Sequence, residues 1–561
     1  MLVVDDPALL TPLGAGQLAF ARVALTSASQ SFHTLAQLAA DADVAVVVAS
    51  LRGDVEAAAR KDPKSGVGLR YSHRRFDPSW LASPASKLEL VGVINRPDRH
   101  AFATAHCGET RLVYRLRYGE FLLPLTVNTV FWQDADPNQT CADVARRWRE
   151  RPQLADVLAH AVFGRVQRSN LKAVEVNAQT VRWPSSVRGD LGGHAEYSLR
   201  VFQPGPDGQL RAGPLENTPD VERLGKNPKL RADLLAWLQD PAQLRAIDRG
   251  VAVLPERFLA TAAQSVTPHG LARRANRPWR QLFAPQELAA LPLAALPRLQ
   301  TPAGLLRRLD TMTCQGCHQS RSVAGFHFVG RQPVGTPDGL HIANSPHLAG
   351  QLQFRAAAAR WLADGAVAGS APAVPSAERS PGAGRSGEPC GRNDAAFAQW
   401  SCGPGLHCAA GADHEVGACV PDVVQVGSPC DAGAVSADPD PHRDGRRGSG
   451  KTPCQRGGFC ESAFAGFPGG SCAGPCAPED PRVACAAIPM FATFNACLAR
   501  GLPFAQCAAD NHNKKAMPGC SEAAPCRDDY VCAPSRAGGV CMPPYFFLQL
   551  RVDGPRRVTT K

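Results

Sequence analysis

The chain has 561 residues, too many for one ordinary domain, and its apolar fraction of 44% is normal for a protein with a packed core. The net charge of +11 comes mostly from arginines scattered along the chain, because only ten of the 61 basic residues are lysine. A nucleic-acid surface needs clustered basic residues, so we expect no nucleic-acid partner. No apolar run approaches about 18 residues, so we expect no transmembrane segment.

The first 86 residues are expected to be a mostly helical segment, followed by an α+β body over residues 87–300. Runs of apolar, β-branched and aromatic residues predict the strands of this body. These strands are expected at 88–95, 110–118, 122–132, 171–183 and 195–203. Helical periodicity predicts helices at 142–162, 228–247, 302–312 and 351–362. The mixture predicts an α+β fold in which helices flank an antiparallel sheet.

Two isolated cysteines occur in this body. Cys107 lies just before one predicted strand, and Cys141 begins the helix that follows the predicted hairpin. In an oxidising compartment we expect a disulfide between them, which would tie the helix to the sheet. The alternative is a pair of buried free thiols.

A small helical segment is expected at 301–364, and it contains the sequence Cys-Gln-Gly-Cys-His at 314–318. Two thiols separated by two residues can each bond one vinyl group of a single haem, and the following imidazole can bind the iron. We therefore expect Cys314 and Cys317 to anchor haem c and His318 to be the proximal iron ligand. Thr301 and Pro302 are typical of a helix start, which places a helix directly before the motif.

Residues 301–365, with this motif between two amphipathic helices, resemble a reduced unit of a c-type cytochrome. The resemblance implies an exported single-haem protein for electron transfer or redox sensing, with a redox partner protein. The chain departs from that family because the next methionine after the motif is Met490, far downstream. Of the histidines His327, His341 and His347, we favour His327 or His347 as the distal ligand. A five-coordinate iron is the alternative.

The motif also has two interpretations that do not involve haem. Cys314 and Cys317 could form a structural or redox-active disulfide, because C-x-x-C serves that role as well. They could also bind zinc together with two of the downstream histidines.

Residues 365–389 are rich in Ala, Pro, Gly and Ser and are predicted to be a flexible linker. Sixteen of the twenty cysteines follow, between residues 390 and 541, and twelve of them form three sets with a central C-x₅-C and a closing glycine-rich turn. The sets are Cys390, Cys402, Cys408 and Cys419; Cys430, Cys454, Cys460 and Cys472; and Cys520, Cys526, Cys532 and Cys541. This regular spacing predicts small repeated modules.

The four remaining cysteines flank or lie within segment 484–508, for which we predict a helical insertion. They are Cys476, Cys485, Cys497 and Cys507. All sixteen are expected to form disulfides, because such small modules cannot supply their own hydrophobic core. Zinc is the alternative, but only Cys472 and Cys476 have the spacing of a zinc knuckle. The final segment, 542–561, is expected to contain a strand over 544–552.

The tail loosely resembles the disulfide-rich EGF-like and Dickkopf-like modules of extracellular proteins. The resemblance implies binding or spacing, and therefore a cell-surface partner. Disulfides predict a location outside the cytoplasm: periplasmic, on the outer surface, or secreted. The first residues, MLVVDDPALL, lack the features of a signal peptide, so we expect the export signal to be missing from this sequence.

The functional hypothesis is thus an exported c-type cytochrome-like protein. The alternative is a cofactor-free structural or binding protein of the cell surface, in which every cysteine forms a bridge. No hydrolase or phosphate-loop motif is present, which favours a role without catalysis. A hydrolase whose site is assembled from distant residues is a third reading.

Overall fold

The computed structural model describes most of the first 421 residues and short strands beyond them. The described residues are 2–26, 34–63, 65–67, 73–119, 121–150, 154–182, 195–265, 276–320, 322, 325–331, 343–367, 370–409 without 377, 380–381 and 386–387, 415–421, 459–461, 471–477, 480–486, 519–521, 526, 531–535 and 538–542.

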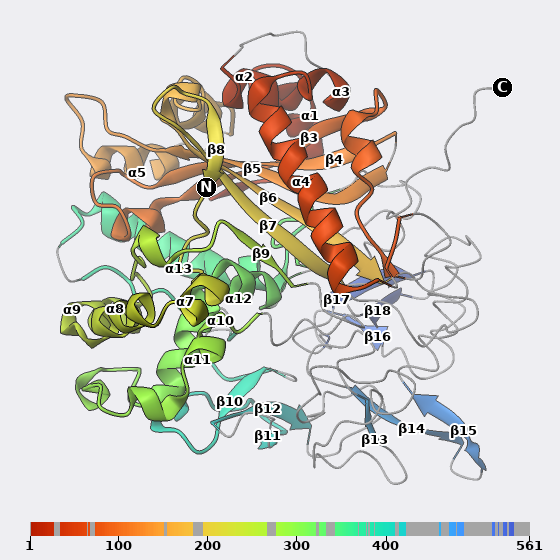
Figure 1. Cartoon of the computed structure of the whole chain (residues 1–561), viewed down its shortest axis with the longest axis vertical. Helices are drawn as coiled ribbons and strands as arrows, with labels where there is room; N and C mark the ends of the chain where they lie inside the picture. The colour runs from red at the N-terminus through yellow and green to blue at the C-terminus, as the bar shows by residue number, and fades with distance from the viewer. Residues whose placement is uncertain are drawn as a thin grey trace.

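A nine-stranded sheet forms the centre of the molecule, and its printed strand pairs are antiparallel (Figure 1). The main order is β1-β3-β4-β5-β6-β7-β8, while β2 pairs with β6 and β9 pairs with β7. The strands are β1 Val3–Val4, β2 His73–Arg74, β3 Ser86–Arg96, β4 Glu109–Tyr118, β5 Phe121–Trp132, β6 Leu171–Arg182, β7 Ala195–Pro204, β8 Leu210–Gly213 and β9 Ala262–Gln264. The α+β prediction is confirmed, and β3 to β7 lie within two residues of the predicted strands.

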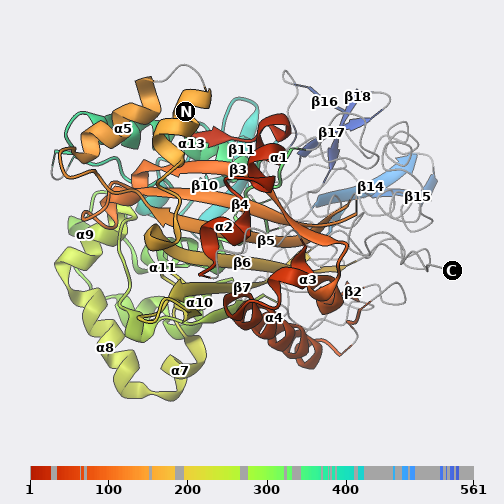
Figure 2. The same cartoon turned by 90° about the horizontal axis from the view of Figure 1, so that it is seen from above.

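The N-terminal helices cover one face of this sheet, as Figures 1 and 2 show. They are α1 Pro7–Ala15, α2 Phe20–Ala24, α3 Leu35–Leu38 and α4 Ala42–Lys61. Alternate strand residues such as Leu112, Tyr114 and Leu116 point into a core shared with these helices. The first 86 residues therefore belong to the same folded unit as the sheet, and they also supply β1 and β2 to it.

A second layer of helices lies on the other side of the sheet (Figure 1). It contains α7 Val221–Lys226, α8 Pro228–Gln239, α9 Pro241–Arg249, α10 Pro278–Leu282, α11 Pro302–Met312, α12 Cys314–Gln319 and α13 Pro346–Ala363. Its own core runs from Leu224 to Leu309 and so includes α11. The motif segment is thus continuous with the helices that precede it.

Prolines divide two of the predicted helices. The predicted helix 228–247 is two helices, because Asp240 caps α9 and Pro241 occupies its first position. The predicted helix 142–162 is divided into α5 Cys141–Glu150, α6 Leu154–Val157 and a π-helical turn Leu158–Val162, with Pro152 between α5 and α6. Short 3₁₀ helices lie at Pro78–Ala82, Pro97–Ala101, Arg168–Asn170, Glu256–Phe258, Pro285–Leu288, Leu293–Ala295 and Ala395–Phe397.

Disulfides occur where the spacing predicted them. Cys107 and Cys141 form a bridge that joins the segment before β4 to the start of α5. In the tail, Cys390 pairs with Cys408, Cys402 with Cys419, and Cys520 with Cys532. Cys526 is also in a disulfide. The predicted disulfide-rich tail is therefore confirmed.

Each tail module contains a three-stranded sheet, with the order β10-β12-β11 in the first, β13-β14-β15 in the second and β16-β18-β17 in the third. Their strands are β10 Pro389–Gly391, β11 Leu406–Ala409 and β12 Val416–Pro421; β13 Phe459–Glu461, β14 Ser471–Ala477 and β15 Asp480–Ala486; and β16 Gly519–Cys520, β17 Val531–Ser535 and β18 Gly538–Met542. The third and fourth cysteines of each set face each other across a strand pair: Cys408 and Cys419, Cys460 and Cys472, Cys532 and Cys541. This common register supports the predicted repeat.

Other tail predictions fall outside the described part of the chain. The residues concerned are Cys430, Cys454, Cys497 and Cys507, the side chains of Cys460, Cys472, Cys476, Cys485 and Cys541, and the predicted strand 544–552. Cys476 and Cys485 lie in strands β14 and β15, so the predicted helical insertion does not begin at 484.

The predicted linker 365–389 contacts the body. The Val374 N–H donates to Arg249 O over 2.9 Å, and the Arg308 side chain donates to Val374 O over 2.6 Å. Arg307 pairs with Glu378 at 2.6 Å. Arginines of α11 thus satisfy polar groups of this segment, which its composition alone did not reveal. Among the described helices, none has the length and apolar character needed to cross a membrane.

Candidate functional site

The Cys-Gln-Gly-Cys-His sequence begins a helix of its own. The N–H of Thr313 donates to Asp310 O at the end of α11, and its hydroxyl accepts the N–H of Gly316 at 2.9 Å as the cap of α12. The sequence predicted a helix directly before the motif, and α11 is that helix. The threonine cap starts a second helix, which gives Cys314 and Cys317 a new direction relative to α11.

Cys314 and Cys317 are free and partly buried in the structure. Burial raises the pKa of both thiols, for Cys317 to about 11, although nearby Arg96, Arg355 and Arg111 lower it in part. Both groups are therefore neutral thiols near pH 7. A redox-active C-x-x-C pair requires an easily formed thiolate, so this environment does not favour the redox-disulfide reading.

His318 is held in a defined orientation. Its Nδ1–H donates to Gly325 O at 2.6 Å, and Asn177 of β6 donates to the same carbonyl at 3.1 Å. Gly325 has a φ of +83°, which suits glycine in this turn. Burial lowers the pKa of His318, so the ring is neutral. A hydrogen-bonded Nδ1 leaves the Nε2 lone pair for a metal or an iron, as in most histidine ligands of proteins.

Two more histidines lie beside Cys317. Its Sγ is 3.4 Å from Nε2 of His327 and 4.0 Å from Nε2 of His347. The ligand atoms of these three residues lie within 4.8 Å of one another. Ser345, the N-cap of α13, contacts Nδ1 of His327 at 3.1 Å and so fixes this ring relative to the helix that carries His347. The zinc reading included Cys314, which is not part of this group, and His341 lies outside the described residues.

A cavity of about 340 Å³ lies between the sheet and helices α11, α12 and α13. Such a volume is typical of sites for small organic ligands or cofactors. Residues 111 and 113 of β4 and residues 173, 175 and 177 of β6 line its sheet side, because alternate strand residues point away from the N-terminal core. The opposite side contains the motif and histidine residues Cys314, Cys317, His318, His327 and His347.

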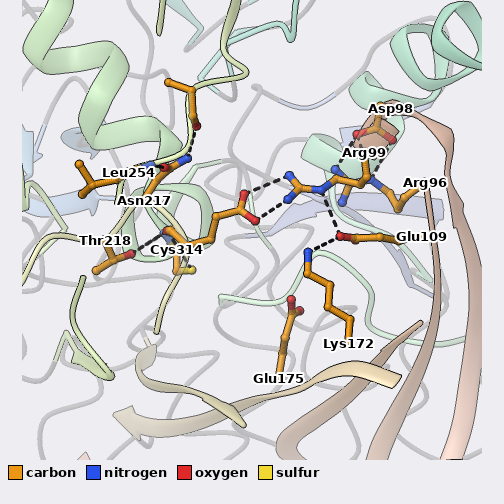
Figure 3. A network of polar contacts seen from close by, with 12 residues as sticks. Arg96, Asp98, Arg99, Glu109, Lys172, Glu175, Asn217, Thr218, Leu254 and Cys314 are labelled. Carbon is orange, nitrogen blue, oxygen red and sulfur yellow. Dashed lines mark hydrogen bonds and ion pairs between the residues drawn. The ribbon is translucent and has the colours of Figure 1, made fainter. Parts of the chain in front are cut away.

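Paired charges form one wall of this cavity (Figure 3). Arg99 donates to Glu216 at 3.0 Å and to Glu109 at 3.3 Å, and Lys172 reaches Glu109 at 2.6 Å. Burial alone would raise the pKa of Glu109, but the surrounding Arg111, Arg99 and Lys172 hold it well below its ordinary value. Buried charges of this kind are stable only when paired, so the network fixes the positions of its members.

The loop between β8 and α7 connects this network to the motif. Asn217 has a φ of 53°, and its side chain bonds Ala252 O at 3.0 Å and Leu254 N at 2.8 Å (Figure 3). The adjacent Thr218 hydroxyl accepts the N–H of Cys314 at 3.1 Å. With Glu216 bound to Arg99, this loop ties the start of α12 to the charged wall.

Sequence reasoning missed the charged wall and one arginine opposite it. Arg355 is 5% exposed and lines the cavity from α13. The sequence did contain a signal for the burial of Arg355. One face of α13 is buried, and it carries Arg355 at helical spacing with Leu348, Gln351 and Leu362. The wall had no such signal, since Arg99 and Glu216 are 117 residues apart.

Comparison of the chain with protein-family models, curated proteins and solved structures finds no match. The site must therefore be interpreted from its own geometry.

Proposed function

We propose that the chain is an exported protein that carries one haem c on Cys314 and Cys317 and acts in electron transfer or redox sensing. The main support is a single arrangement: two free thiols with haem-attachment spacing at the edge of a cavity that also contains three imidazoles. The described cysteines of the disulfide-bonded modules have partners, whereas these two do not.

The residues around the cavity fit such a group. Its volume of about 340 Å³ lies in the range of cofactor sites. The Nδ1 of His318 is bonded to Gly325 O, so its Nε2 lone pair could bind an iron. Arginine and lysine side chains face the same space, and carboxylates such as those of a porphyrin are stabilised by such cations.

Each residue then has a defined role. Cys314 and Cys317 would hold the group covalently, and His318 would bind its iron while Gly325 and Asn177 keep the ring in place. His327 or His347 would supply a second imidazole to the same group; the ring centroids of His318 and His327 are 5.5 Å apart. When bound, haem c supplies a reversible one-electron change at the iron.

The disulfides are consistent with a protein outside the cytoplasm, where such bonds persist. We propose a periplasmic, outer-surface or secreted location, with the tail modules as a docking or spacing element toward a redox or cell-surface partner.

A second candidate rests on the group formed by Cys317, His327 and His347. Thiolate and imidazole are both zinc ligands, so these three residues could bind zinc with a fourth position left for water. The same Cys317 cannot serve as a haem thioether and as a zinc thiolate at once, so the two candidates exclude each other.

One experiment separates them. The full chain is produced in an oxidising compartment with haem-attachment machinery and examined by pyridine haemochrome spectroscopy and intact mass. We expect covalent haem on the wild type and on a Cys402→Ser/Cys419→Ser control, and its complete loss in the Cys314→Ser/Cys317→Ser variant.

If the site binds zinc instead of haem, binding should not require Cys314. Folded, colourless protein that binds one zinc ion, keeps it in Cys314→Ser and loses it in Cys317→Ser would replace the haem proposal. Folded protein with neither group, from a host that loads another c-type cytochrome, would overturn both cofactor candidates and favour the cofactor-free surface protein.

A further inference from the structure

Arg355 is a buried cation of the cavity whose guanidinium lacks hydrogen-bond partners at two of its nitrogens in the described part of the chain. Its side chain lies on the inner face of α13 and is 5% exposed. Its Nε and Nη1 atoms are buried and have no hydrogen-bond partner in the described part of the chain. Buried guanidinium groups are normally paired, because an unpaired buried charge is costly.

The neighbouring charged residues do not offset the buried positive charge of Arg355. Each of the other four cations on this side of the cavity contacts a carboxylate: Arg96 with Asp98, Arg99 with Glu216, Arg111 with Glu109, and Lys172 with Glu109. Arg111 also forms an ion pair with Glu175. Among these residues there are five cations and four carboxylates, and Arg355 is the cation without a carboxylate contact in the described part of the chain. Arg308 also lines the cavity, but its guanidinium donates to the carbonyls of Ile247 and Val374.

Arg355 remains charged despite its burial. Burial, followed by the nearby Arg96, lowers its pKa to about 9, and Asp98 opposes this shift. That value is still above pH 7. The guanidinium of Arg355 is therefore buried, charged and without a hydrogen-bond partner at Nε and Nη1 in the described part of the chain, and it lines the same cavity as Cys317.

We propose that the cavity binds an organic carboxylate, whose oxygens pair with the guanidinium of Arg355. A planar guanidinium binds a carboxylate through two parallel hydrogen bonds, and one carboxylate balances one excess charge. The cavity is far larger than a chloride ion and suits an organic acid.

The carboxylate has two sources. It is a propionate of a covalently attached porphyrin, in which case this inference extends the proposed function, or it belongs to a free small organic acid. Both require Arg355, and they differ in whether haem-bearing protein still has room for an added carboxylate.

The test measures the thermal unfolding midpoint of the full chain in sodium propionate against sodium chloride of equal ionic strength. It is run on haem-free protein and on haem-bearing protein. The variants are Arg355→Met and, as a matched control on the exposed side of the same helix, Arg360→Met. Arg355→Met should fold at least as stably as the wild type without added anion, because it removes an unpaired buried charge.

We expect propionate to raise the midpoint of haem-free wild type and of Arg360→Met, and to have no effect on Arg355→Met. If haem-bearing wild type no longer responds, a porphyrin propionate occupies the position; if it responds as well, the ligand is a free acid. A haem-free wild type that does not respond, or an Arg355→Met variant that responds like the wild type, would overturn the inference. Haem mass is read separately, so failure of haem attachment leaves the haem-free comparison intact.

Discussion

Asp310 lies near the end of α11, four residues before Cys314, and its side chain is 6% exposed. Its Oδ1 accepts the N–H of Trp279 at 2.8 Å, while Oδ2 is buried without a hydrogen-bond partner. Arg280 is 3.7 Å from Oδ2 and only partly offsets the burial. Burial therefore raises the pKa of Asp310 to about 7. The carboxyl is accordingly a source of pH-dependent stability in the helix that leads to the motif.

This pKa predicts the direction of a pH effect. In the unfolded chain an aspartate ionises near pH 3.9, so stability from protonated Asp310 is complete below about pH 4 and is lost as the pH rises toward 7. Asp310→Asn keeps the acceptor for Trp279 and cannot ionise. Its stability relative to the wild type should increase between pH 4 and 7, by at most about 4 kcal/mol, and then stay constant. Urea unfolding at several pH values measures this difference.

The exposed Asp233→Asn on α8 is the control and should follow the wild-type pH profile. Parallel profiles for Asp310→Asn and the wild type would show that the carboxyl is ionised over this whole range.

The junction of α11 and α12 decides where the motif points. Thr313 ends one helix and caps the next, and Gly316 packs directly on the last turn of α11. A Cβ atom on Gly316 would lie 2.0 Å from Asp310 O and 2.8 Å from Asp310 C, which are backbone atoms with little freedom to move. The glycine inside the motif is thus required by packing between two helices.

Gly316→Ala should lower the free energy of unfolding by about 1–3 kcal/mol or more, because the junction must open to admit the methyl group. Chemical denaturation measures this loss. Gly53→Ala in α4 is the matched control, since nothing lies within 4 Å of its added Cβ. That control should gain about 0.5–1 kcal/mol from helix propensity. Equal stability of Gly316→Ala and the wild type would mean that α12 is not anchored at this point.

The whole molecule combines two means of stabilisation. The body has two extended apolar cores, one between the sheet and the N-terminal helices and one within the second helical layer. In the described part of the first tail module, Ala396, Phe397 and Val416 form a small apolar cluster with Trp400 packed against it, and two disulfides cross-link the module. A cluster of that size cannot offset the entropy of ordering the module, so its disulfides must.

Reduction should therefore act differently on the two parts. With a thiol reductant, we expect protease cleavage within 389–421, while the body stays resistant and loses about 3 kcal/mol through the bridge between Cys107 and Cys141. Limited proteolysis followed by mass spectrometry locates the cuts. The oxidised protein is the control. A reduced first module that resists protease as well as the oxidised one would show that its small apolar cluster suffices.

The sequence by itself determined the features that depend on local pattern. Strands β3 to β7 and helix α11 were predictable because their apolar periodicity reports directly which face is buried. The tail modules were predictable because the C-x₅-C spacing repeats along the chain. Helix α13 was predicted only in part, since its first turn with Pro346 and His347 lies before the apolar pattern begins.

Only the tertiary structure decided which chemical groups meet in the cavity. The motif was visible as five adjacent residues, but its surroundings come from β4, β6, the loop after β8, and α13. The downstream histidines were candidate ligands in the sequence, but the pairing of Arg99 with Glu216, the pairing of Glu109 with Lys172 and the position of Arg355 in the same cavity join residues distant in sequence. No local pattern encodes such pairs, because they arise from the folding of the sheet and the helical layer against each other.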